Sequence, residues 1–140
     1  MKLTNPTDEQ LNEAFAVHVA GWKLWPRIYH NNQWHDVPTW VAPPFASKED
    51  GIAPAGQLLG ASCPKFTASA EAVMPWLEKA KSTFPCSDTR CDSSFDGKQW
   101  CVSIAAPSWD DDSFFGEGKS FPRAAVIALL RAHGVEIEFT

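Results

Sequence analysis

Apolar residues recur at helical spacing near the start of the chain, which is typical of an amphipathic helix with one buried face. The positions that recur are Leu11, Ala14, Phe15, His18, Val19 and Trp22. Thr7 followed by Gln10 forms a capping-box pattern just before them, and Gly21 is a helix-ending residue just after them. The sequence therefore predicts a first helix over residues 8–22.

A second run with helical spacing lies near the middle of the chain. Its apolar positions are Ala70, Val73, Met74 and Leu77. Thr67 or Ser69 is a suitable N-cap, and Glu71 in the first turn suits the helix dipole. Pro75 comes only one or two turns after the cap, so we expect it to kink this second helix rather than end it.

A third helix is bounded by clear start and stop residues. Ser120 is a good N-cap, Pro122 falls in the first turn, and Gly134 marks the end. The middle of this helix is apolar nearly all round, which predicts packing on more than one side. After it, apolar residues alternate with glutamates as in a strand. The alternating residues are Val135, Glu136, Ile137, Glu138 and Phe139.

The segments between the helices show less regular patterns. Residues 23–66 are rich in Trp, Pro, Gly and Asn, which predicts short extended pieces and turns forming an arm or a flap. Residues 83–98 are polar and predict a loop that ends in an Asp96–Gly97 hairpin turn. The alternation from Trp100 to Ile104 predicts a strand, and the aromatic, glycine-rich residues 114–118 predict a segment able to close over a flat group. Together these elements predict an α+β fold.

Composition narrows the function class. The 140 residues, 44% hydrophobic, predict one domain over 1–140, and no run approaches the ~18 apolar residues of a membrane span. The amino terminus has no apolar signal core, so a cytoplasmic location is expected. A net charge of −5 disfavours duplex nucleic-acid binding, which needs clustered Lys and Arg. The composition leaves open the binding of a small anion by one or two arginines.

Aromatic and sulfur residues add two expectations. Seven Trp and nine Phe against one Tyr exceed the needs of a small core, so some of these rings should face a ligand or a partner. The four cysteines lack the short spacing of a zinc knuckle, so reduced thiols and no metal are expected. They are Cys63, Cys86, Cys91 and Cys101. Cys86 and Cys91 fall in the predicted polar loop.

Catalytic motifs are missing from the sequence. It contains no nucleophile elbow, zinc-binding helix motif, phosphate loop or dinucleotide fingerprint. Trp34, His35 and Asp36 are consecutive, so on a strand their side chains would not converge. The run Asp110–Asp112 lacks the alternating ligands of a calcium loop and predicts a solvated segment. Binding without a cofactor is therefore the favoured class.

A binding site is expected near the third helix. Arg123 falls in its first turn, where free backbone N–H groups and the helix dipole also attract an anion such as a phosphate. Trp100, Trp109 and Phe115 are candidate stacking faces for a base. The alternative for Arg123 is a helix-end arginine that only pairs with acidic residues, and the sequence leaves both open.

Several segments, in chain order, resemble the phage ABA-sandwich domain proteins. They are Val19–Trp22, the Trp/Pro-rich arm, Phe66–Met74, Lys98–Ser103 and Phe121–Ala125 with the helix that follows. The resemblance implies a small antiparallel sheet sandwiched between three main helices. It also extends to the anti-Thoeris phage sponges, which sequester cyclic ADP-ribose isomers or cyclic oligonucleotides without cleaving them.

This resemblance implies a phage anti-defence protein in the host bacterial cytoplasm that acts as a homo-oligomer on a cyclic nucleotide signal. By position it implies Trp100, Arg123 and Arg131 as ligand-binding residues. The two arginines are eight residues apart, with Ile127 between them, whereas the sponges place two arginines close together on this helix. Two other classes stay open, a protein-binding inhibitor of a host defence protein and a nucleotide hydrolase built from distant residues.

Overall fold

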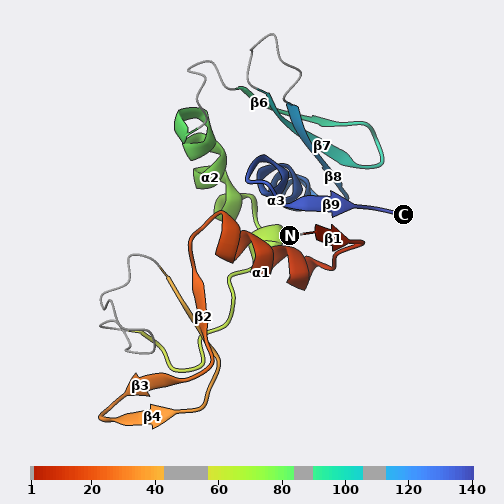
Figure 1. Cartoon of the computed structure of the whole chain (residues 1–140). Coiled ribbons are helices and arrows are strands. Elements are labelled where there is room, and N and C mark those ends of the chain that lie inside the picture. The colour runs from red at the N-terminus through yellow and green to blue at the C-terminus, as the bar shows by residue number, and fades with distance from the viewer. Residues whose placement is uncertain (1, 43–56, 84–89, 106–112) are drawn as a thin grey trace.

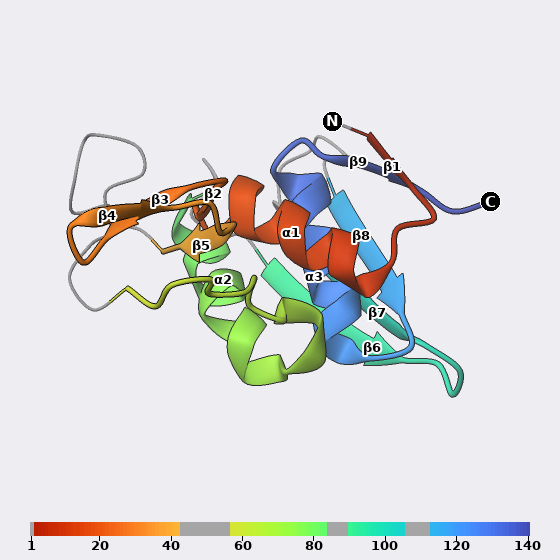
Figure 2. The same ribbon diagram turned by 90° about the horizontal axis from the view of Figure 1, so that it is seen from below.

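The structure, a computed structural model, describes residues 2–42, 57–83, 90–105 and 113–140. Its long central helix α3, Phe121–Ala132, lies between a three-stranded antiparallel sheet and the helices α1, Asp8–His18, and α2, Ala70–Thr83 (Figures 1 and 2). Helices combined with small antiparallel sheets confirm the predicted α+β sandwich-like fold, but the layers run from the sheet to α3 to α1 and α2, whereas a sheet between helices was expected. No helix within the described ranges is long and apolar enough to cross a membrane.

The helix α3 is the centre of the core. Ser120 caps it as predicted, since its hydroxyl accepts the backbone N–H of Arg123 at 3.3 Å. Every residue from Ala124 to Leu130 is fully buried, because the sheet covers one side of the helix and α1 and α2 cover the other. Gly134 follows the helix at φ +89°, a conformation that favours glycine. The predicted limits and the packing on more than one side are both confirmed.

The three-stranded sheet has the order β6, Arg90–Phe95, then β7, Trp100–Ala105, then β8, Ser113–Gly118. The predicted β7 strand and the Asp96–Gly97 turn are confirmed, the carboxylate of Asp96 accepting the N–H groups of Lys98 and Gln99 at 2.9 and 2.8 Å. These two bonds stabilise the ionised carboxylate and lower the pKa of Asp96.

Two sequence predictions around this sheet were wrong. Residues 90–95, predicted as loop, form β6, because a polar segment is held extended by pairing along the whole of β7. Residues 114–118, predicted as a closing segment, form most of β8, whose Gly116 lies against α3. A Cβ at that glycine would lie 1.9 Å from the carbonyl oxygen of Ala124, so the close approach of strand and helix requires glycine.

The first helix is shorter than predicted. Its capping box is present, with the Gln10 N–H donating to Thr7 Oγ1 at 3.2 Å and the Thr7 N–H donating to Gln10 Oε1 at 2.9 Å. It ends at His18 rather than at residue 22, because the chain turns at Gly21, φ +78°. His18 is therefore exposed at the helix end and not part of the apolar face.

Aromatic packing joins α1 to the second helical region. A short 3-10 helix, Phe66–Ala68, precedes α2, and the ring of Phe66 lies 4.5 Å from that of Phe15 in α1. Trp76 of α2 meets Phe15 edge-on at 6.1 Å. As expected, Pro75 lies within α2 without ending it.

The arm predicted at 23–66 is built, where the structure describes it, from two pairs of short antiparallel strands. The strands β2, Lys23–Trp25, and β5, Thr39–Val41, form its base, and β3, Ile28–His30, with β4, Gln33–His35, forms a hairpin that projects from the body (Figure 1). Buried Trp25, Ile28 and Val41 give the arm a small core of its own. Asn31 and Asn32 both adopt positive φ, as a two-residue hairpin turn requires.

The two ends of the described chain lie side by side. The predicted final strand is confirmed as β9, Glu136–Glu138, and it pairs in parallel with β1, Lys2–Thr4. β1 was not predicted, because three residues carry too little alternation and its partner is more than a hundred residues away.

Candidate functional site

The structure describes four of the five predicted binding residues, and it does not bring these four together at one place. Trp100 begins β7 and is half-buried, with the rings of Phe95 and Phe121 centred 5.4 and 5.7 Å from its own. Neighbouring aromatic rings therefore occupy much of its surface. Trp109 lies outside the described residues, as do Cys86 and the acidic run Asp110–Asp112.

Phe115 and Arg131 meet at the far end of α3. Phe115 is half exposed in β8, opposite Ser103, and its carbonyl oxygen accepts Nη1 of Arg131 at 2.5 Å. Nη2 of the same guanidinium donates to the carbonyl oxygen of Ile137 in β9 at 2.9 Å. Arg131 therefore links the facing edges of β8 and β9, and both of its terminal nitrogens are used in this link.

Arg123 lies at the opposite end of the helix. Its Nη1 pairs with the carboxylate of Asp8, the first residue of α1, and its Nη2 donates to the carbonyl oxygen of Pro6 at 3.1 Å. Eight residues of helix separate it from Arg131, about 12 Å along the axis. The two arginines therefore cannot grip one phosphate group. The ion-pair alternative for Arg123 is present, with Asp8 as the partner.

A cavity of about 650 Å³ opens at the amino end of α3. We call it the α3 cavity, and it is lined by Asp8, Gln99, Glu117, Gly118, Lys119, Ser120, Arg123 and Phe139. It contains two side-chain cations, Lys119 and Arg123, and the amide of Gln99, which donates to Glu117 at 3.0 Å. The sequence analysis missed Lys119, although its place next to the Ser120 cap was a signal for it.

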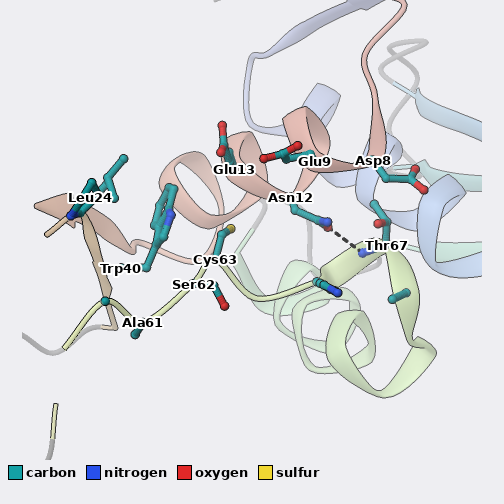
Figure 3. Close-up of a pocket in the computed structure, with 14 residues that line it drawn as sticks. Asp8, Glu9, Asn12, Glu13, Leu24, Trp40, Ala61, Ser62, Cys63 and Thr67 are labelled. Atoms are coloured by element: carbon teal, nitrogen blue, oxygen red, sulfur yellow. Dashed lines mark hydrogen bonds between the residues drawn. The ribbon is translucent and has the colours of Figure 1, made fainter. Parts of the chain in front are cut away.

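A second cavity, of about 700 Å³, shares Asp8 with the first and is drawn in Figure 3. We call it the α1 cleft, because one wall is the helix face that carries Glu9, Asn12 and Glu13. The opposite walls come from the base of the arm and from residues 60–68. Nothing in the sequence analysis predicted this cleft, since its walls are far apart in the chain.

One cysteine lies in the α1 cleft. Cys63 is half-buried between Trp40 and α1 (Figure 3). Burial, with a smaller contribution from the negative charge of Glu13, raises the pKa of the Cys63 thiol to about 11. The thiol is therefore protonated and uncharged at neutral pH. Cys63 and Cys101 are both free thiols.

The described residues offer no assembled catalytic group. Trp34, His35 and Asp36 have different partners, as expected: Trp34 contacts Tyr29, His35 lies against the carbonyl oxygen of His30 at 3.2 Å, and Asp36 pairs with Arg27. Within the described ranges no three His, Cys, Asp or Glu side chains gather closely enough to hold a metal ion. What the described residues do form are two cavities of ligand size, the α3 cavity and the α1 cleft.

Comparison of the chain with protein-family models, with curated proteins and with solved structures finds no match.

Proposed function

We propose that this chain is a phage anti-defence protein that binds and sequesters a cyclic nucleotide immune signal in the host bacterial cytoplasm. The signal would be a cyclic ADP-ribose isomer or a cyclic oligonucleotide, bound without cleavage. The observation that carries the proposal is the α3 cavity, in which Arg123 and Lys119 flank the amino end of a long helix. Its volume is in the range of small-molecule sites.

Charge at this end of α3 favours a phosphate group. The dipole of α3 attracts an anion to this end of the helix, and two side-chain cations lie within the same cavity. Asp8 now supplies the negative charge beside Arg123. An incoming phosphate would take over this interaction, and the exposed Asp8 side chain can turn to solvent.

The polar and aromatic groups of the cavity suit the rest of a nucleotide. Gln99 and Glu117 offer an amide and a carboxylate, which can bond the polar edge of a base. Phe139 is half exposed and lines the same cavity, so its ring is open for stacking. Phe139 takes the stacking role in this proposal, because the neighbours of Trp100 already cover much of its ring.

The resemblance also supports a homo-oligomer. The face of the three-stranded sheet away from α3 carries Ser94, Cys101, Ser103 and the half-exposed Phe115. The exposed Glu117, paired with Cys101, lies on the same face, so a second copy packing there would meet one large ring, one carboxylate and several small side chains. Light scattering of the purified protein measures the assembly directly.

Thermal melting against a panel of cyclic dinucleotides, cyclic trinucleotides and cyclic ADP-ribose isomers tests the function. A ligand at about 100 times its dissociation constant adds ~2.7 kcal/mol, a shift of several degrees for a chain of this size. The shift should disappear in Arg123→Ala and persist in Arg27→Ala, which removes the same charge from the arm. Ligand recovered intact after heating supports sequestration, whereas cleaved ligand indicates a hydrolase. No shift with any ligand would reject the proposal.

A second candidate, an inhibitor that binds a host defence protein, is favoured by the hairpin of the arm. Trp34 is 48% exposed at its surface, packed edge-on against the exposed Tyr29 at 5.4 Å. The guanidinium of Arg27 lies over the Trp34 ring at 4.6 Å. Exposed aromatic residues of this kind dominate protein interfaces. Binding of a protein target would be lost in the Trp34→Ala variant and retained in the Arg123→Ala variant.

A further inference from the structure

The α1 cleft lies outside the α3 cavity and has a different chemistry. Glu9, Asn12 and Glu13 occupy one face of α1, since residues three and four positions apart are neighbours on a helix. Figure 3 shows their side chains along one side of the cleft, with Trp40 and Leu24 at one end. The cleft therefore has an acidic wall and an apolar end.

The acidic wall is not neutralised by the protein itself. Asp8 is paired with Arg123, but neither Glu9 nor Glu13 has an ion-pair partner among the described residues. Two carboxylates at this spacing repel each other and weaken a helix unless a cation lies between them. Lys65, an exposed residue, supplies the one ammonium group found in the described lining of the cleft.

Asn12 adds an independent sign of a ligand. Its side chain is more than nine-tenths buried, and Oδ1 accepts the backbone N–H of Thr67 at 2.9 Å, which fixes the orientation of the amide. The Nδ2 group has no acceptor among the residues that the structure describes. Among the described residues Nδ2 is not one of the fully buried atoms left without a partner, so it is accessible at the cleft, where a carbonyl oxygen can accept its N–H.

The apolar end is rigid. The backbone N–H of Trp40 donates to the carbonyl oxygen of Ala61 at 2.9 Å, and its carbonyl oxygen accepts Nε2 of Gln57 at 3.2 Å. These bonds fix the backbone of Trp40, whose indole lies between Leu24 and Cys63 in Figure 3. Pro38 and Leu24 extend the apolar lining beside it. An aliphatic or aromatic side chain would fit against this end.

We propose that the α1 cleft binds a basic peptide segment, with an arginine or lysine side chain between Glu9 and Glu13 and an apolar side chain against the half-exposed Leu24 beside Trp40. Its main-chain carbonyl would accept Nδ2 of Asn12. A small alkylamine supplies the cation but no carbonyl, and a nucleotide would bring negative charge to an acidic wall. A basic peptide meets all three features at once.

Neutral Cys63 fits this assignment. Burial and, to a smaller extent, the negative charge of Glu13 raise the pKa of the thiol, and this charge disfavours an anion in the cleft and favours a cation. The proposal does not rest on nucleotide binding in the α3 cavity, because among the described lining residues the two cavities share Asp8 alone.

The test is a two-dimensional NMR titration of the ¹⁵N-labelled full chain with acetylated, amidated hexapeptides. Each peptide carries one arginine and one leucine at a different separation, and a partner set replaces arginine with citrulline, which is neutral and nearly the same shape. At least one arginine peptide should shift the side-chain NH₂ signals of Asn12. The citrulline peptides should bind about fivefold more weakly or not at all.

Two protein variants locate the charge effect. Glu9→Gln with Glu13→Gln should weaken the arginine peptide about fivefold. Glu71→Gln with Glu136→Gln removes the same charge from exposed positions outside the cleft and should leave binding unchanged. Thermal melting checks that both variants fold. Equal binding by both variants, equal binding of citrulline peptides, or no Asn12 shift up to millimolar peptide would overturn the proposal.

Discussion

Asp8 and Arg123 form an ion pair that joins the first residue of α1 to the first turn of α3. An arginine in the first turn of a helix is opposed by the helix dipole, and the carboxylate of Asp8 offsets this cost. Asp8 is also the residue that lines both cavities. The pair therefore controls how much of the Arg123 charge is available to a ligand in the α3 cavity.

Asp8→Asn is expected to tighten nucleotide binding about fivefold, because the ligand no longer competes with a carboxylate for Arg123. The cost in stability should stay within ~1 kcal/mol, since the Asp8 side chain is 66% exposed. Titration calorimetry with the ligand found by melting measures the affinity. Asp36→Asn, which breaks the Arg27 pair on the arm, is the matched control. Unchanged or weaker binding in Asp8→Asn would show that Arg123 does not contact the ligand.

Arg131→Lys is expected to lower the free energy of unfolding by ~2 kcal/mol, because an ammonium group cannot bond the carbonyl oxygens of Phe115 and Ile137 with the same planar fork. Urea unfolding measures this loss, with Arg27→Lys as a control at an exposed ion pair. Nucleotide affinity should not change. A variant of normal stability that binds the ligand more weakly would instead place Arg131 in the binding site.

The parts of the fold that were predictable are those set by local signals. Ser120 and Gly134 delimit α3 through cap chemistry that acts over a few residues, and Asp96–Gly97 specifies its turn in the same way. β6 was not predictable, because residues 90–95 are polar and become a strand only through pairing with β7. Local patterns contain no information about that partner.

The candidate sites were harder to foresee than the elements. Arg123 was chosen because a helix start is visible in the sequence, and in the structure it lines the α3 cavity. Arg131 was chosen from the same helix, but its guanidinium donates to backbone carbonyl oxygens of β8 and β9. The sequence gives no sign that these two strands lie beside it. The sequence did not mark Asn12 as a cleft residue, because it is one polar residue within an amphipathic helix. Its hydrogen-bond partner Thr67 is 55 positions away in the chain.

Gly116→Ala is expected to destabilise the protein by about 3 kcal/mol, because the new methyl group would overlap the backbone of Ala124 and Ala128. The strand would have to move away from α3, which opens the core. Gly97→Ala is the comparison, where nothing lies near the added methyl group and only the positive φ is penalised, at ~1 kcal/mol. Denaturant unfolding should rank the two losses in this order. A smaller loss for Gly116→Ala would mean that β8 does not pack this closely.

Cys63 is expected to react slowly with iodoacetamide in the folded protein. The thiolate is the reactive form, and a pKa near 11 instead of 9.0 leaves about a hundredfold less of it at pH 8. Mass spectrometry of the Cys63 peptide, folded and in urea, gives the two rates. Glu13→Gln should recover part of the rate and Glu9→Gln none, because burial is the larger cause and the charge of Glu13 the smaller. The proton held more tightly in the folded state also means that stability declines as pH rises from 9 toward 11, and Cys63→Ser should remove that slope. Equal rates in folded and unfolded protein would show that the α1 cleft does not shield the thiol.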